Sequence, residues 1–128
     1  AIAKAVKANA ALIVVAPCCH KQIRREIEKS GCASKDNPLQ FLMQYGTYVE
    51  RVSEMVTDGM RAELMELSGY KVNLFEFISD THTPKNVMIT AMRQTVSDKR
   101  AAALRGSLEA TKAQFGIGRH YLESALAG

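Results

Sequence analysis

Residues 11–16 read ALIVVA, a continuous apolar run in which Ile13, Val14 and Val15 are β-branched. Runs of this kind are typical of strands that are buried on both faces, as in parallel sheets. Pro17 ends the predicted strand, because proline has no amide hydrogen to give to a neighbouring strand. The run therefore predicts the first strand of an α/β fold whose sheet is covered by helices.

Two further stretches have the composition of strands. Residues 70–78, YKVNLFEFI, alternate between two faces, and residues 87–92 read VMITAM. The order strand, helices, strand favours a right-handed parallel crossover, and the last strand then returns antiparallel to its predecessor. The sequence thus predicts a small three-stranded mixed sheet, with one parallel crossover and a C-terminal hairpin, flanked by helices.

Helical patterns fill most of the remaining chain, at 1–8, 21–29, 38–45, 48–67 and 98–115. The longest of these helices has the clearest boundaries. Thr47 and Glu50 have the spacing of a capping box at its start, and Gly69 follows its end. Arg61 lies in the middle of this helix, where we expect a structural ion pair.

Length and composition indicate one globular domain. The chain has 128 residues, of which 47% are hydrophobic and 23% charged. No apolar run approaches the about 18 residues of a membrane span, so no membrane partner is expected. The three cysteines include the adjacent pair Cys18 and Cys19, for which no disulfide framework fits. Reduced thiols predict a cytoplasmic protein.

The positive charge is concentrated near the C-terminus. The formal net charge is +4, and the stretch 99–119 accounts for all of it, with Glu109 as its one acid. Its basic residues are Lys99, Arg100, Arg105, Lys112 and Arg119. A basic helix favours an anionic partner, of which RNA is the first candidate. The alternative is a solvated helix face without a partner.

Three strings carry a resemblance to a known family: LIVVAPCCHKQIRREI from residue 12, TDGMRAELMELSGYKV from residue 57 and FEFISDTHTPKNVMITAMR from residue 75. Together they resemble class I S-adenosylmethionine (SAM)-dependent methyltransferases with a Pro-Cys-Cys-His motif, which are related to RNA methyltransferases with a Cys-Cys-His motif. The resemblance covers about residues 1–93. It implies the C-terminal half of a methyltransferase domain, followed by a basic helical extension at 94–128.

In that family the sheet has seven strands, and the last one runs antiparallel, inserted beside the fifth and sixth. The predicted strands match these three, so the resemblance implies a partial Rossmann-like methyltransferase fold. No Gly-x-Gly turn follows a strand in this sequence, and no acidic residue stands where a ribose would be held. We therefore expect the chain to be a fragment that is inactive by itself, with SAM binding only to the longer parent protein. The exposed edge of such a fragment favours a homodimer.

The resemblance also implies acceptor-side residues in two segments that follow strands. His20 is the predicted catalytic residue, because it could orient or deprotonate an acceptor hydroxyl or nitrogen. The predicted substrate-binding residues are Pro17, Cys18, Cys19, His82, Thr83, Lys85 and Asn86. The plainer interpretation makes the cysteines small buried apolar side chains and the second segment a polar turn.

Other functions remain open beside the methyltransferase. A zinc site could draw on Cys18, Cys19, His20, Cys32 and His82, although adjacent cysteines lack the spacing that lets a loop wrap a metal ion. A cysteine nucleophile with a histidine base is a second rival. A third is an independent RNA- or protein-binding α/β module that acts through the basic C-terminal helix. The acceptor of the methyl group is RNA, a protein or a small molecule.

Overall fold

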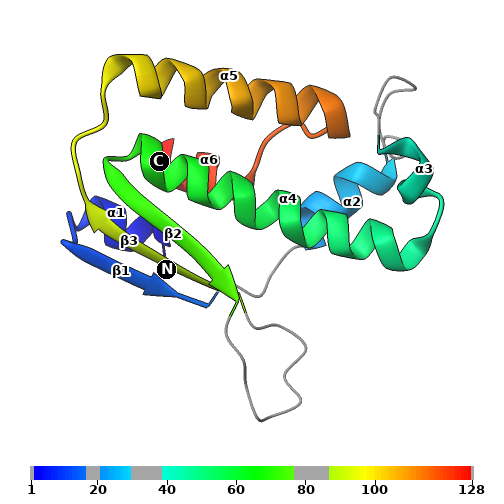
Figure 1. Cartoon of the computed structure of the whole chain (residues 1–128), viewed down its shortest axis with the longest axis horizontal. Helices are drawn as coiled ribbons and strands as arrows, with labels where there is room; N and C mark the ends of the chain where they lie inside the picture. Colours follow the sequence, from blue (N-terminus) through cyan, green and yellow to red (C-terminus); the bar gives the residue numbers. More distant parts are fainter. Residues whose placement is uncertain (1, 17–20, 30–38, 77–86, 128) are drawn as a thin grey trace, which may run out of the picture.

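The computed structural model describes residues 2–16, 21–29, 39–76 and 87–127. The elements are α1 (Ile2–Lys7), β1 (Leu12–Val15), α2 (Lys21–Lys29), α3 (Gln40–Met43), α4 (Gly46–Leu67), β2 (Tyr70–Glu76), β3 (Val87–Arg93), α5 (Asp98–Phe115) and α6 (Tyr121–Ala127). The predicted α/β class, with a small three-stranded sheet and flanking helices, is confirmed (Figure 1). Within the described part of the chain, no helix combines the length and apolar composition that a membrane crossing requires.

The strand order is β1-β3-β2, with β3 hydrogen-bonded to both neighbours in antiparallel pairing. The prediction of a mixed sheet with a parallel pair is therefore wrong for the described strands. The reason is that β3 lies between the two strands that the crossover joins (Figure 1). β1 and β2 run in the same direction, because each is antiparallel to β3, but they do not pair with each other.

One face of the sheet forms part of the core. Ile13, Ile89 and Ala91 point into it and are buried. α4 packs against β2 and α1 against β1, while α6 contacts both α1 and α4, so these helices cover the same face. The expectation that β1 is buried on both faces is wrong, since Leu12 and Val14 are 59% and 54% exposed. An apolar run can thus form a strand whose second face lies open.

α4 is the central helix of the molecule and begins two residues earlier than predicted. Its N-cap is Tyr45, in an extended conformation, and no side chain caps it. The expected capping box of Thr47 and Glu50 is therefore wrong, because the helix has already started at Gly46. Gly69 ends the helix as predicted, with a φ of 97° that side-chain-bearing residues rarely adopt.

α5 has the bounds that the sequence predicts. Ser97 caps its start by accepting a 3.2 Å hydrogen bond from the backbone N–H of Arg100, and Gly116 closes it in the left-handed conformation. Leu108 and Phe115 join the same core as the sheet residues. The division of the chain at residue 93 remains a prediction, although residues after it share this core.

Candidate functional site

All residues that the sequence assigns to the acceptor side lie outside the described residues. They are Pro17, Cys18, Cys19, His20, His82, Thr83, Lys85 and Asn86. The structure does place the strand ends from which their segments continue, Val15 in β1 and Glu76 in β2. The assignment of these residues stays a prediction, while the strand ends fix where both segments begin.

The carboxyl ends of β1 and β2 lie at the same end of the sheet. Val15 ends β1 and pairs with Ile89, and Leu74 of β2 pairs with the same Ile89 from the other side. The arrowheads of both strands accordingly point the same way in Figure 1. The segments after the two strands therefore start at the same end of the sheet. In open α/β sheets, ligands bind at the carboxyl ends of the strands.

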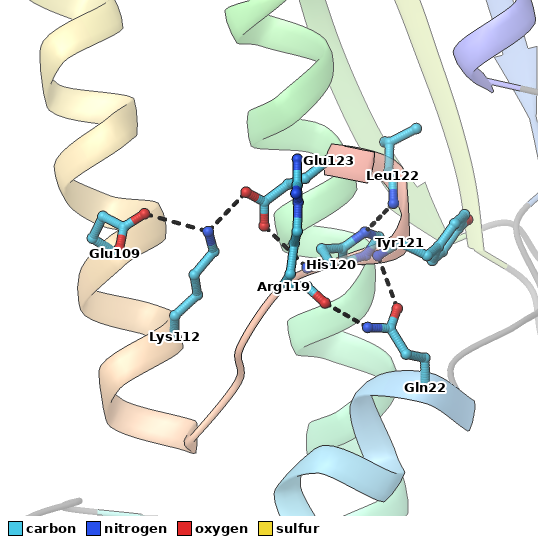
Figure 2. Close-up of polar contacts among 8 residues, drawn as sticks. All are labelled: Gln22, Glu109, Lys112, Arg119, His120, Tyr121, Leu122 and Glu123. Atoms are coloured by element: carbon cyan, nitrogen blue, oxygen red, sulfur yellow. Dashed lines mark hydrogen bonds and ion pairs between the residues drawn. The ribbon is translucent and has the colours of Figure 1, made fainter. Parts of the chain in front are cut away.

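α2 starts directly after the first of these segments, and its first turn is fastened to the C-terminal part of the chain. The Nε2 group of Gln22 donates to the backbone carbonyl of Arg119, and its Oε1 accepts a 2.8 Å bond from the N–H of Tyr121 (Figure 2). One side-chain amide thus holds the turn before α6. Gln22 follows His20 by two residues in the sequence. Its two hydrogen bonds therefore hold the first turn of α2 against the turn before α6.

Arg61 of α4 is buried beside the same turn, with a side chain that is 3% exposed. Its Nη1 lies 2.7 Å from Oδ1 of Asp58, and its Nε donates a 3.0 Å hydrogen bond to the hydroxyl of Tyr121. The guanidinium carbon also lies 5.3 Å from the centre of the Tyr121 ring. The expected structural ion pair of Arg61 is confirmed, with Asp58 as its partner.

His120 is fully buried and caps the start of α6. Its Nδ1 accepts a 3.0 Å hydrogen bond from the N–H of Leu122, and its own backbone N–H donates to Oε1 of Glu123 at 3.0 Å. This reciprocal pair has the form of a capping box in which histidine replaces serine or threonine. Since Nδ1 accepts, the neutral ring carries its proton on Nε2.

Burial lowers the pKa of His120 from its ordinary 6.5 to about 4, because the charged ring would lose its hydration. The positive charge of Arg61 lowers this pKa further. The backbone carbonyl of Thr57 and the carboxylate of Glu123 favour the protonated ring, but they do not outweigh the burial. The ring, stacked on Tyr121 with centroids 4.7 Å apart, is therefore uncharged at neutral pH.

Lys112 of α5 pairs with two carboxylates, and the pair with Glu123 joins α5 to the last helix. Its Nζ lies 2.7 Å from Glu123 and 3.3 Å from Glu109 (Figure 2). Partial burial would lower the pKa of Lys112, but the hydrogen bonds to Glu123 and Glu109 outweigh it and raise that pKa. Burial would likewise raise the pKa of Glu123, whereas its bonds to Lys112 and to the N–H of His120 lower it. Both groups are charged at neutral pH.

This polar cluster, formed by Gln22, Arg61, Lys112, His120 and Glu123, binds α2, α4, α5 and α6 to one another. Its charged groups are paired, and His120 is out of reach of solvent. The arrangement stabilises the helices and presents no reactive group. Sequence analysis missed it, although the spacing of Glu123 three residues after His120, at the start of a helix, is a signal for the cap.

The five basic residues near the C-terminus do not form one continuous stripe. Arg100 makes two hydrogen bonds to Glu66, of 2.7 and 3.1 Å, which raise its pKa, and Lys112 is taken up by the polar cluster. Lys99, Arg105 and Arg119 are exposed. With 3.6 residues per turn, Arg100 and Arg105 lie on opposite flanks of the buried face of α5.

No three His, Cys, Asp or Glu side chains of the described ranges come together in a way that could hold a metal ion. The zinc and cysteine-nucleophile alternatives depend on residues outside those ranges and stay hypotheses. Comparison with protein families, curated proteins and solved structures finds no match to this chain. A functional assignment therefore depends on the sequence motifs and on the geometry of the sheet.

Proposed function

We propose that this chain supplies the acceptor side of a cytoplasmic SAM-dependent methyltransferase. The observation that carries the proposal is the position of β3. It lies between β1 and β2 and antiparallel to both, while β1 and β2 run in the same direction. The resemblance implies a seventh strand inserted antiparallel beside a fifth and a sixth, and the position of β3 is compatible with that insertion. The arrangement supports the proposal because it follows from the register and not from the motifs.

The described residues do not fit SAM itself. A methyltransferase holds the cofactor at a glycine-rich turn after a strand, where the backbone can approach the ligand closely. β1 is followed by Ala16, β2 by Phe77 and β3 by Gln94, and no glycine lies between Gly69 and Gly106. In our proposal SAM therefore binds to a part of the parent protein outside this sequence.

The proposed work of this chain is to bind and orient the acceptor. In this proposal Pro17, Cys18 and Cys19 contribute to binding the acceptor, and so do His82, Thr83, Lys85 and Asn86. His20 would take a proton from the acceptor hydroxyl or nitrogen. The strand arrangement supports this proposal, because both segments start from strand ends at the same end of the sheet. Positioning the acceptor in line with the methyl donor supplies a large share of the rate enhancement in reactions between two bound molecules.

The test uses the full-length parent protein with SAM carrying a tritiated methyl group. RNA, protein and small-molecule extracts serve as separate acceptors. We expect incorporation into one class, and we expect His20→Ala to reduce it by about 10²–10⁴ while SAM affinity stays unchanged. Arg25→Gln, at an exposed position on α2, is the matched control and should retain activity. A parent that binds SAM but labels none of the three extracts would contradict the proposal.

A binding module is the second candidate function. The exposure of Lys99, Arg105 and Arg119 favours it, because these cations are accessible to an anionic partner such as RNA. The ion pairs of Arg100 and Lys112 weigh against all five basic residues acting together. RNA binding without any methyl transfer by the parent protein would favour this candidate over the first.

A further inference from the structure

Two grooves lie at the end of the sheet opposite the carboxyl ends of β1 and β2. They have volumes of about 460 and 450 Å³ and share Gln94, Thr95 and Val96, the connection between β3 and α5. One groove continues over the start of β2 towards Arg100, and the other continues over Ser68 and Gly69 at the end of α4. Together they form a polar depression that passes on both sides of this connection.

Cations surround the two grooves. Lys71 and Arg100 line the first groove, Arg93 lines the second, and the exposed Lys99 is the neighbour of Arg100. Arg93 is held in place by a 3.1 Å hydrogen bond from its Nη1 to the carbonyl of Asn9. The acids nearby are Glu66, which is engaged by Arg100, Glu63, whose charge also acts on Arg100, and Asp98 at the start of α5. The cations Lys71, Arg93, Lys99 and Arg100 outnumber these acids by one, so the surface keeps a small excess of positive charge.

We propose that this surface binds the phosphate backbone of a single-stranded RNA. Lys71 and Arg93 in the lining provide the charge, together with the exposed Lys99, which lies in the chain between the lining residues Ser97 and Arg100. Positively charged grooves follow the backbone of single strands. Gln94, Thr95 and Ser97 add uncharged polar groups, which commonly contact phosphate and sugar oxygens. A concave polar lining suits a nucleic-acid strand better than the flat surface of a lipid bilayer.

The binding is expected to be independent of RNA sequence. Tyr70, the aromatic residue in the lining of the first groove, is buried, and its hydroxyl donates a 2.7 Å hydrogen bond to the carbonyl of Ala10. Its ring is therefore not available for stacking on a base, and the contacts that remain are to phosphate and sugar, which carry no sequence information directly. The inference does not depend on methyl transfer, since the grooves lie at the other end of the sheet.

The test measures fluorescence anisotropy of a labelled single-stranded RNA of mixed sequence, without SAM, between 50 and 200 mM salt (about the range over which binding to phosphates weakens strongly). We expect binding that weakens with salt. Lys71→Gln with Lys99→Gln should lower the affinity and flatten the slope of log K against log salt by about 0.7 for each phosphate that the variant no longer neutralises. The control variant Arg25→Gln with Lys29→Gln removes the same charge from exposed positions on α2. It should leave the affinity and the salt slope nearly unchanged.

Two further measurements keep the inference falsifiable. Circular dichroism verifies that both double variants are folded, as expected for exposed side chains, and a second RNA of different sequence should bind with the same affinity. Absence of RNA binding at 50 mM salt (about the low end of that range) would overturn the inference. So would equal decreases of affinity in both double variants, or binding to vesicles of anionic lipid that exceeds the binding to RNA. Methyl transfer by the parent protein plays no part in any of these outcomes, so the two proposals can fail separately.

Discussion

Nε of Arg61 donates a 3.0 Å hydrogen bond to the hydroxyl of Tyr121, from a side chain that is almost completely buried. The two residues are 60 positions apart and join the middle of α4 to the start of α6. Asp58, also in α4, forms an ion pair with the same guanidinium. The last helix is thus attached to the central helix by a buried charge, and its packing depends on that charge being compensated.

Arg61→Met should destabilise the fold. The substitution retains an apolar stem but removes the ion pair with Asp58 and the hydrogen bond to the Tyr121 hydroxyl, and breaking a buried pair on one side costs about 3 kcal/mol. The free energy of unfolding in urea measures the effect. Arg25→Met, at an exposed position on α2, is the control and should change it by less than about 0.5 kcal/mol. Equal effects of both substitutions would contradict the role assigned to Arg61.

Stability should fall as the pH is lowered from 6.5 towards 4, because of His120. Its pKa is lowered in the folded chain to about 4 from an ordinary 6.5, so the unfolded chain binds the proton more readily in that interval. The contribution is fully present above 6.5 and is lost as the pH approaches 4. A shift of this size corresponds to roughly 3 kcal/mol.

His120→Asn isolates that contribution. Asparagine is a good N-cap and can still accept the N–H of Leu122, but it does not titrate. We expect this variant to be less stable at pH 7, since a smaller side chain fills the site, and to show a flatter profile between 6.5 and 4.5. Below 4.5, the ordinary pKa of Glu123, both proteins should lose stability, because the pKa of that carboxylate is lowered in the fold. An unchanged slope in the variant would show that other groups cause the dependence.

SAM should show no specific binding to this chain by itself in isothermal titration. The sequence has no glycine-rich turn after a strand, and the described strands are followed by Ala16, Phe77 and Gln94. The full-length parent, titrated under the same conditions, is the positive control. Micromolar affinity of the isolated chain would place the cofactor site inside this sequence and would contradict its assignment to the acceptor side.

Helices were predictable from this sequence because their boundaries are set by local signals. Ser97 and Gly116 mark the ends of α5, and Ile23 and Ile27, the apolar residues of α2, are both fully buried as their spacing of four implies. The start of α4 was missed because Tyr45 turns extended without any side-chain cap, which leaves no signal in the sequence. Local sequence signals thus predict that a helix is present more accurately than they predict the residue at which it begins.

Strand pairing was less predictable, since it depends on contacts between distant residues. Ile89 pairs with Val15 and with Leu74, and nothing in the run ALIVVA indicates that its neighbour is a strand more than 70 residues later in the sequence (Leu12 pairs with Met92). The polar cluster around His120 was missed for the same reason. Gln22 is an ordinary helix residue until the turn at Tyr121 is placed beside it. The acceptor-side residues, named from motifs, lie outside the described residues.

The second face of the sheet is open and carries exposed apolar side chains, with Lys71, Asn73 and Thr90 between them. Leu12 of β1 pairs with Met92 of β3, which puts both side chains on this face, and they are 59% and 63% exposed. Val14 lies on it too, and so does Phe75 at the other side of the sheet, through its pairing with Met88. A group of large exposed apolar side chains on one face is often an interaction site. β1 also has one edge without a strand partner among the described residues.

We expect the isolated chain to self-associate through this face, most simply as a two-fold dimer, because such symmetry lets one apolar patch cover its own copy. The free edge of β1 adds unpaired backbone groups that recruit another chain. Sedimentation velocity at increasing concentration measures the association. Val14→Lys should weaken it by placing a charge in the interface, whereas Met55→Lys, on an exposed apolar residue of α4, should not. A monomer at high concentration would mean that the open face is not an interface between copies, and association weakened equally in both variants would place the interface elsewhere.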